Sequence, residues 1–84
     1  MYQTIHEKID VIGVYSHSTF KPVKFQWRDR VLKVEKITSI ADIKDGGVKR
    51  RLYSVLVKGN LYRLLFHRDG EFWMLEEVWV EEGV

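Results

Sequence analysis

Basic and aromatic side chains are interleaved in the segment KFQWRDRVLKV, residues 24–34. Cations that follow a phosphate backbone, together with rings on which bases stack, are the chemistry that single-strand nucleic-acid binders use. A second basic run, KRR at 49–51, leads into an apolar segment, and a further arginine follows at 68. The candidate phosphate-binding residues are therefore Lys24, Arg28, Arg30, Lys33, Lys49, Arg50, Arg51 and Arg68.

Strand periodicity argues against a binding face at the first of these clusters. In an extended chain, successive side chains point to opposite faces. Phe25 and Trp27 then share the apolar face with Val23. Lys24 and Lys33 lie on the other face. This pattern is typical of a core and a solvated surface, so we expect Trp27 to point inward and the basic tip to keep an exposed turn soluble.

Residues that could support catalysis or bind a metal are few and poorly spaced. Asp29 and Asp69 fall in expected turns, where aspartate is favoured for its backbone hydrogen bonding. His17 lies between two serines, with no acid at a spacing that suggests a triad. No two of the three histidines are close in sequence, and the chain has no cysteine, whereas zinc sites normally show close spacing. We expect no enzymatic activity, no metal and no cofactor.

The charges are segregated along the chain although the net charge is only +2. Residues 44–68 carry seven cations and one carboxylate, and residues 69–84 carry six carboxylates and no cation. Two outcomes are open: the acidic last strand neutralises the basic middle strands across the sheet, or one basic face remains.

Turn signals divide the chain into short segments rich in Val, Leu, Tyr, Phe and Trp, which are strand-forming residues. The expected reversals lie at Arg28-Asp29, Gly46-Gly47, Gly59-Asn60 and Asp69-Gly70. The register that these reversals imply brings apolar residues opposite one another. The expected cross-strand pairs are Phe25–Leu32, Val57–Tyr62, Val55–Leu64, Tyr53–Phe66 and Phe66–Trp73, with Arg63 opposite Glu76.

These segments predict a single all-β domain over residues 1–84, with about six antiparallel strands in a meander. We expect the first strand at Lys8–Ser16. The link from Thr38 to Val48 is expected to be irregular, and Ser39–Asp42 has the pattern of a single helical turn. Three strands are expected on each side of this link, and the three that follow it are apolar on both faces. The sheet is therefore expected to curl into a small barrel or to form a two-layer sandwich.

The second apolar face also suggests protein association. It consists of Leu52, Leu56, Leu61, Leu65, Phe72, Met74 and Val78. The candidate interface residues are Leu52, Trp73 and Trp79, because large aromatic and aliphatic side chains anchor interfaces. The partner would be a second copy of the chain or a polymerase or repair protein.

The segment Pro22-Val-Lys-Phe-Gln-Trp-Arg-Asp-Arg30, followed by alternating Leu32–Ile37, resembles an uncharacterised prokaryotic family of small β domains. The hallmark of that family is similar to P-x-x-F-x-W-R-G-R, and its closing hairpin is similar to Phe72–Trp79 here. Such domains occur alone or on the C-terminal side of Y-family, mutagenesis-type DNA polymerases. This chain departs from the pattern at Asp29, where the family has glycine, and in its central link, which lacks a tryptophan-rich stretch.

The resemblance implies a role near DNA repair or replication. The leading hypothesis is a non-catalytic β module that contacts single-stranded nucleic acid through a basic surface. The alternative is a protein-interaction or self-associating domain that binds no nucleic acid. No apolar stretch approaches the about 20 residues needed to cross a bilayer, and the N-terminus does not read as a signal peptide. We therefore expect a cytoplasmic protein with no membrane partner.

Overall fold

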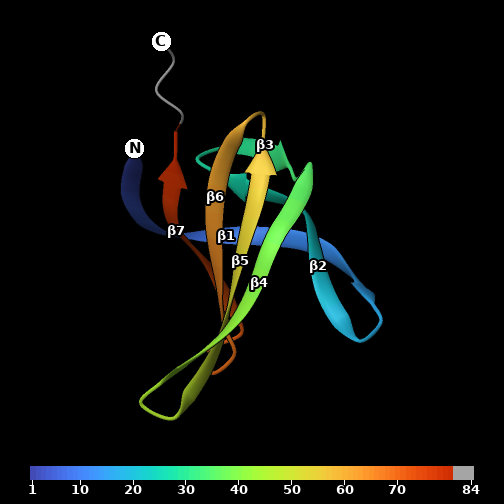
Figure 1. Cartoon of the computed structure of the whole chain (residues 1–84), viewed down its shortest axis with the longest axis vertical. Coiled ribbons are helices and arrows are strands. Elements are labelled where there is room, and N and C mark those ends of the chain that lie inside the picture. The colour runs from blue at the N-terminus through green and yellow to red at the C-terminus, as the bar shows by residue number, and fades with distance from the viewer. Residues whose placement is uncertain (81–84) are drawn as a thin grey trace.

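Seven antiparallel strands form one meander sheet in the computed structural model of the chain (Figure 1). The structure describes residues 1–80, with only the backbone described at position 45. The strands are β1 (Tyr2–Ser16), β2 (Thr19–Trp27), β3 (Arg30–Lys33), β4 (Lys36–Asp45), β5 (Val48–Val57), β6 (Asn60–His67) and β7 (Phe72–Trp79). Their order in the sheet is β3-β2-β1-β7-β6-β5-β4. The described residues form no apolar helix long enough to span a membrane.

The long first strand curls the sheet into a half-barrel. Residues 2–9 of β1 pair with β7, and residues 10–16 pair with β2 instead. The register shifts between Thr4 and Glu7 and again between Ile12 and Gly13. Such bulges bend a strand and increase its twist, so β1 carries the β2–β3 pair over the concave face of β5, β6 and β7.

The core fills this concave face. Phe25 of β2 lies 5.4 Å from Tyr62 of β6, ring centroid to ring centroid. The Tyr53 hydroxyl donates a hydrogen bond of 2.6 Å to the backbone carbonyl of Phe20. The buried cluster consists of Ile9, Phe25, Leu32, Tyr53, Val55, Val57, Tyr62, Leu64, Leu75 and Val78. Apolar burial of this kind is the main stabilising term for a domain with no disulfide.

Two of the expected reversals have the predicted register. Phe25 pairs with Leu32 across the 28–29 turn, and Phe66 pairs with Trp73 across the 68–71 loop, as expected. Asp29 stands at a φ of 62°, where glycine is normally preferred.

The reversal predicted at 59–60 lies one residue earlier, at Lys58-Gly59. Val57 therefore pairs with Asn60, and Val55 pairs with Tyr62. The turn needs positive φ at both central residues, and glycine takes the second of them with φ 80°. Because the pairing of β5 with β6 moves by two residues, the side chains of these two strands keep their predicted faces.

The predicted irregular link is instead the edge strand β4, and the predicted helical turn at Ser39–Asp42 does not form. Ile40 pairs with Tyr53 of β5, and the Gly46-Gly47 turn joins the two strands. The segment is rich in β-branched residues, with isoleucine at 37, 40 and 43 and threonine at 38, and such residues favour a strand over a helical turn. β1 also begins at Tyr2 rather than Lys8. The sheet therefore has seven strands rather than six.

Bulges reverse two of the predicted side-chain directions. Val23 was placed on the apolar face but is 46% exposed, because the register shifts at Ile12/Gly13. Val78 was placed on the outer face but is 4% exposed and opposes Tyr62. A shift between Arg63 and Leu64 causes this second reversal, and it also pairs Arg63 with Glu77 rather than Glu76.

Candidate nucleic-acid interface

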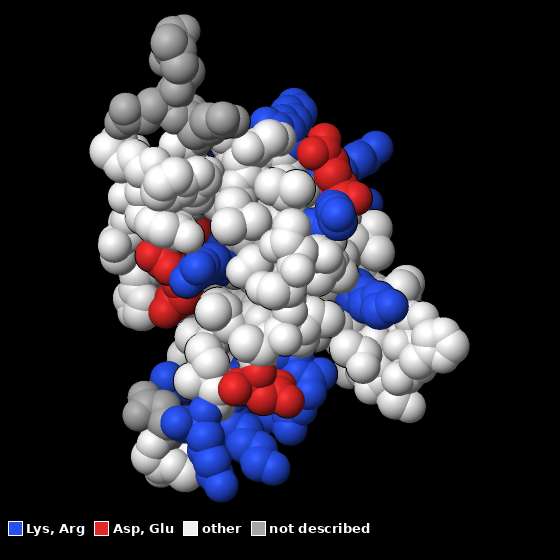
Figure 2. Space-filling view, in the orientation of Figure 1, with Lys and Arg blue, Asp and Glu red and all other residues white. Residues whose placement is uncertain are grey.

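The structure separates the candidate phosphate-binding residues into two groups at different ends of the molecule. Lys24, Arg28, Arg30 and Lys33 belong to β2, β3 and their turn. Lys49, Arg50 and Arg51 begin β5, and Arg68 follows β6. Figure 2 shows basic side chains gathered at the lower end of the view, where the β4–β5 hairpin lies in Figure 1.

One cation of the first group, Arg28, is paired with a carboxylate of β1. Glu7 accepts hydrogen bonds from Trp27 Nε1 at 3.0 Å and from Arg28 Nε at 3.1 Å. The Arg28 guanidinium also lies over the Trp27 ring, 4.7 Å from its centroid. Trp27 is partly buried against the core, as predicted. The carboxylate of Glu7 neutralises Arg28, whereas Arg30 and Lys33 remain exposed.

The pKa of Glu7 lies below its ordinary value of 4.5 because Arg28 and then Trp27 donate hydrogen bonds to the carboxylate. A carboxylate with a lowered folded-state pKa stabilises the fold above its unfolded pKa, and that contribution is lost as pH falls through the folded value. We expect the melting temperature of Glu7→Gln to be lower than wild type at pH 6–8. Below about pH 4.5 the difference should shrink. Thermal melts across pH, monitored by circular dichroism, measure it.

A matched control for this prediction is Glu35→Gln. Glu35 is exposed, and its side chain accepts no hydrogen bond from a described residue. The control removes the same charge and should shift the melting temperature little at any pH. A Glu7→Gln penalty that persists unchanged into acid would contradict the role assigned to the carboxylate.

Three residues of the second group, Lys49, Arg51 and Arg68, line a cationic groove of about 360 Å³, and Arg50 is not among its lining residues. The groove is lined by Asp42, Ile43, Lys44, Lys49, Arg51 and Arg68. Arg51 Nε donates to Asp42 at 2.7 Å, and this hydrogen bond is the main cause that lowers the pKa of Asp42, with Arg68 and Lys49 adding to it. Among the described side chains that line the groove, one carboxylate therefore stands among four cations.

Lys44 and Lys49 are directly opposite each other in the β4–β5 ladder. Like charges in opposed positions repel and destabilise a sheet. Neither lysine, nor Arg68, donates a hydrogen bond to a side chain within the described residues. An anion in the cationic groove would relieve that repulsion, which makes this end of the molecule the better candidate for phosphate contact.

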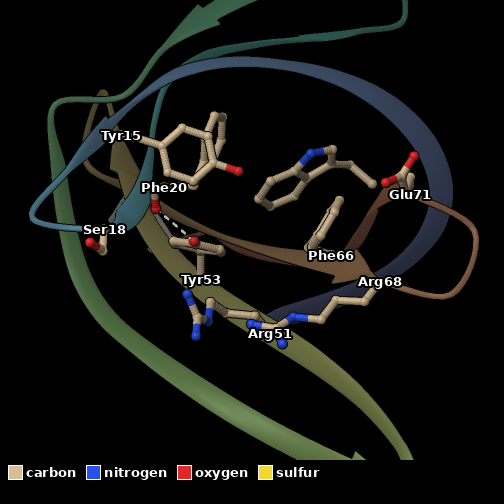
Figure 3. A pocket seen from close by; sticks show the side chains of 9 residues that line it. Tyr15, Ser18, Phe20, Arg51, Tyr53, Phe66, Arg68 and Glu71 are labelled. Atoms are coloured by element: carbon tan, nitrogen blue, oxygen red, sulfur yellow. Dashed lines mark hydrogen bonds between the residues drawn. The ribbon is translucent and has the colours of Figure 1, made fainter.

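An aromatic pocket of about 460 Å³ adjoins the cationic groove (Figure 3). Tyr15 and Phe20 come from the β1–β2 hairpin, and Tyr53, Phe66 and Trp73 form the other side. The Trp73 ring lies 4.9 Å from Phe66 and 5.3 Å from Tyr53, between centroids. Burial raises the pKa of the Tyr53 phenol, which therefore remains a neutral donor to Phe20.

Arg51 and Arg68 line both the aromatic pocket and the cationic groove. A single row across the ladder accounts for the position of Arg51: Asp42 pairs with Arg51, Arg51 with Phe66, and Phe66 with Trp73. Paired residues in a ladder share one face. Here cations and aromatics thus lie on the same concave face, unlike the separation that holds at the first hairpin.

The sequence did not lead us to predict that cations and aromatic rings share this face, although the alternation of side chains along the strands indicates part of it. Arg51 has the same parity as Tyr53, and Arg68 has the same parity as Phe66, so the ladder alone places both arginines on the aromatic face. Lys44 was not recognised because its segment was expected to be irregular. Tyr15 and Phe20 reach the site only through the curl of the sheet, which no local pattern reports.

Within residues 69–80, the described part of the acidic segment, the carboxylates of β7 do not pair with the cations of the groove; residues 81–84 lie outside the described residues. Glu77 pairs with Arg63 at 3.2 Å, and Glu76 pairs with His6 at 2.9 Å. Both pairs involve strands β1, β6 and β7 away from the Lys44–Lys49 pair. The carboxylate nearest the aromatic pocket is that of Glu71 in the 68–71 loop. No three His, Asp or Glu side chains of the described residues come together in a way that could hold a metal ion.

The three candidate interface residues have different positions. Trp73 lies in the aromatic pocket, partly buried against the core. Leu52 is half-buried on the convex face. Trp79 is 39% exposed, and its ring packs against Tyr2 with centroids 4.6 Å apart. The structure therefore does not bring them together as one surface.

Comparisons with known proteins give no assignment: the chain matches no protein-family model, no curated protein and no solved structure.

Proposed function

We propose that this chain is a non-catalytic β module that binds single-stranded nucleic acid at the cationic groove and the adjoining aromatic pocket. The observation that carries the proposal is the joining of the two cavities by Arg51 and Arg68. Cations beside aromatic rings on one concave face suit a flexible phosphate chain with unpaired bases. The opposed Lys44–Lys49 pair places two like charges side by side, and an anionic ligand would reduce their repulsion.

The proposed setting is DNA repair or replication. It is supported by the resemblance of residues 22–37 and 72–79 to domains that accompany Y-family polymerases. The active partner in such an assembly would be the polymerase, and this module would hold the single strand beside it. The proposal places the strand at the β4–β5 end rather than at the Arg28-Asp29 tip.

Salt-dependent binding of labelled oligothymidylate tests the proposal. Three to four phosphate contacts on a single strand imply that affinity falls by about 20- to 50-fold between about 50 mM and 200 mM salt. The double variant Lys49→Ala/Arg68→Ala should weaken binding at low salt. It should also reduce the slope of log affinity against log salt by about 1.4, because each lost contact contributes about 0.7. Fluorescence anisotropy measures both quantities.

The matched control is Arg30→Ala/Lys33→Ala, which removes the same charge from the other end of the molecule. It should leave affinity and slope close to wild type after a small uniform loss from net charge. If both double variants weaken binding equally, the site is not the cationic groove. If wild type fails to bind at low salt, the proposed function is wrong.

One observation favours the alternative of a protein-interaction or self-associating domain. Four apolar side chains on the β1–β2–β3 part of the sheet are unusually exposed: Ile12 at 59%, Val14 at 56%, Val23 at 46% and Val31 at 59%. Exposed apolar groups gathered in one region often mark an interface. Absence of oligonucleotide binding, together with a mass above one 10.0 kDa chain in light scattering, would favour this alternative.

A further inference from the structure

The aromatic pocket opens between two hairpins of different chemical character. Tyr15, Ser18 and Phe20 of the β1–β2 hairpin form one wall. Arg51 and Tyr53 of β5, with Phe66 and Arg68 of β6 and its following loop, form the other. In Figure 2 the tip of the β1–β2 hairpin, at the lower right, is uncharged, whereas the β4–β5 end at the lower left is basic.

Tyr15 is the feature of this pocket that the fold itself does not explain. Its side chain is 78% exposed, the highest value among the large apolar and aromatic residues described as exposed. Its ring touches Phe20, with centroids 5.3 Å apart, and Phe20 continues to Trp73 at 5.7 Å. A ring held at the mouth of an aromatic cluster, with its own surface in water, is a free stacking platform.

We propose that the pocket holds one unstacked nucleobase of the bound strand, with the phosphate of that nucleotide at Arg68. This inference rests on the proposed function and specifies the ligand chemistry of the same site. The cavity of about 460 Å³ falls in the range of about 300–1,000 Å³ typical of small-molecule sites. Its walls offer π surfaces for a planar ring.

The polar groups on the rim determine how the nucleotide is oriented. Arg51 donates hydrogen bonds to both carboxylate oxygens of Asp42, at 2.7 Å from Nε and 3.5 Å from an Nη atom, so its guanidinium is held at the pocket wall. Arg68 is exposed and donates no hydrogen bond to a described side chain, so it can turn toward a phosphate. Glu71 also lines the pocket and lies away from Arg51 in Figure 3.

These positions exclude an anion deep on the Glu71 side, because the carboxylate would repel it. The uncharged base therefore enters the pocket, where the Glu71 carboxylate and the Ser18 hydroxyl can accept hydrogen bonds from its amino or imino groups. The phosphates lie outside, along Arg68 and Lys49 toward the cationic groove. A simple aliphatic ligand would make no use of this combination of rings and guanidinium groups.

A comparison of a normal strand with a base-free strand tests the inference. The ligands are an oligothymidylate and an oligomer of the same length and phosphate count whose sugars lack bases. Wild type should bind the base-free strand about tenfold more weakly, the size of effect expected when stacking of one base is lost. Tyr15→Ala should bind the normal strand about tenfold more weakly and the base-free strand unchanged.

The matched control is Tyr2→Ala, since Tyr2 is 46% exposed but lies against Trp79 outside the pocket. It should discriminate between the two strands like wild type. Because Tyr15 is exposed, Tyr15→Ala is expected to keep the wild-type circular dichroism spectrum. Equal affinity of wild type for both strands, or no effect of Tyr15→Ala, would overturn the base pocket while leaving salt-dependent binding intact. Loss of all oligonucleotide binding by wild type would overturn the proposed function as well.

Discussion

Replacing Leu75 by alanine should lower the free energy of unfolding by about 3 kcal/mol. Leu75 lies at the centre of β7, is fully buried, and opposes Leu64, which is equally buried. Removing three carbons there forfeits the transfer free energy of the side chain and leaves a cavity that neighbouring strands cannot fill. A domain of this size is stabilised by roughly 4–13 kcal/mol, so the loss is a large fraction of the total.

Urea unfolding followed by circular dichroism measures this effect, with the variant's midpoint shifted and its slope unchanged. Leu52→Ala is the matched control, because it makes the same chemical change at a half-buried position on the convex face. We expect the free energy of unfolding of Leu52→Ala to fall by less than about 1.5 kcal/mol, because the Leu52 side chain buries less apolar surface on folding than Leu75 does. Equal losses at the two sites would contradict the assignment of the concave face as the core.

Replacing Gly13 by alanine should destabilise the fold by about 2–3 kcal/mol, at the upper end of what one added methyl group does in a packed site. A Cβ atom at this position would lie 2.3 Å from the backbone carbonyl oxygen of Lys21 and 2.6 Å from the Phe20 ring. The side chain of Phe20 can turn away, but the Lys21 oxygen belongs to the β1–β2 ladder. The strands must therefore separate at the bulge.

The Gly13→Ala substitution also links the fold to the site, because Phe20 is a wall of the aromatic pocket. The variant should lose oligothymidylate affinity in addition to stability. Val14→Ala provides the control, since Val14 is the next residue and is 56% exposed. It should change the free energy of unfolding by less than about 1 kcal/mol. A Gly13→Ala protein as stable as wild type would show that the ladder has room at the bulge.

The half-barrel explains why a small domain can present both a core and an open site on one face. Toward the 28–29 turn, β2 and β3 cover the concave face, and Phe25 seals it against Tyr62. Toward the β4–β5 hairpin the two layers diverge. Along the concave face of β5 and β6, valine and leucine give way to aromatic residues and arginine in this direction. The aromatic pocket is therefore the end of the concave face that β2 and β3 leave uncovered.

Local patterns in the chain were sufficient for the all-β class and for the face of most side chains. Alternation over Tyr53, Val55 and Val57 predicts a strand with one buried face, and glycine or aspartate marks the reversals, because both effects depend on neighbouring residues only. They also located the inward position of Trp27 and the pairs Phe25–Leu32 and Phe66–Trp73. The predicted turn at Gly59-Asn60 was wrong by one residue, which moves the pairing of β5 with β6 by two residues and so leaves each side chain on the face predicted for it.

Tertiary structure alone decided where the bulges lie, that residues 36–45 add an edge strand, and which aromatics meet the arginines. The bulges at Gly13 and near Glu76 arise because β1 must serve two partners and the sheet must curl, which are requirements of the whole sheet. Tyr15 lies more than fifty residues from Arg68 in sequence. Only packing of the curled layers, driven by burial of the shared core, brings the two side chains to one pocket.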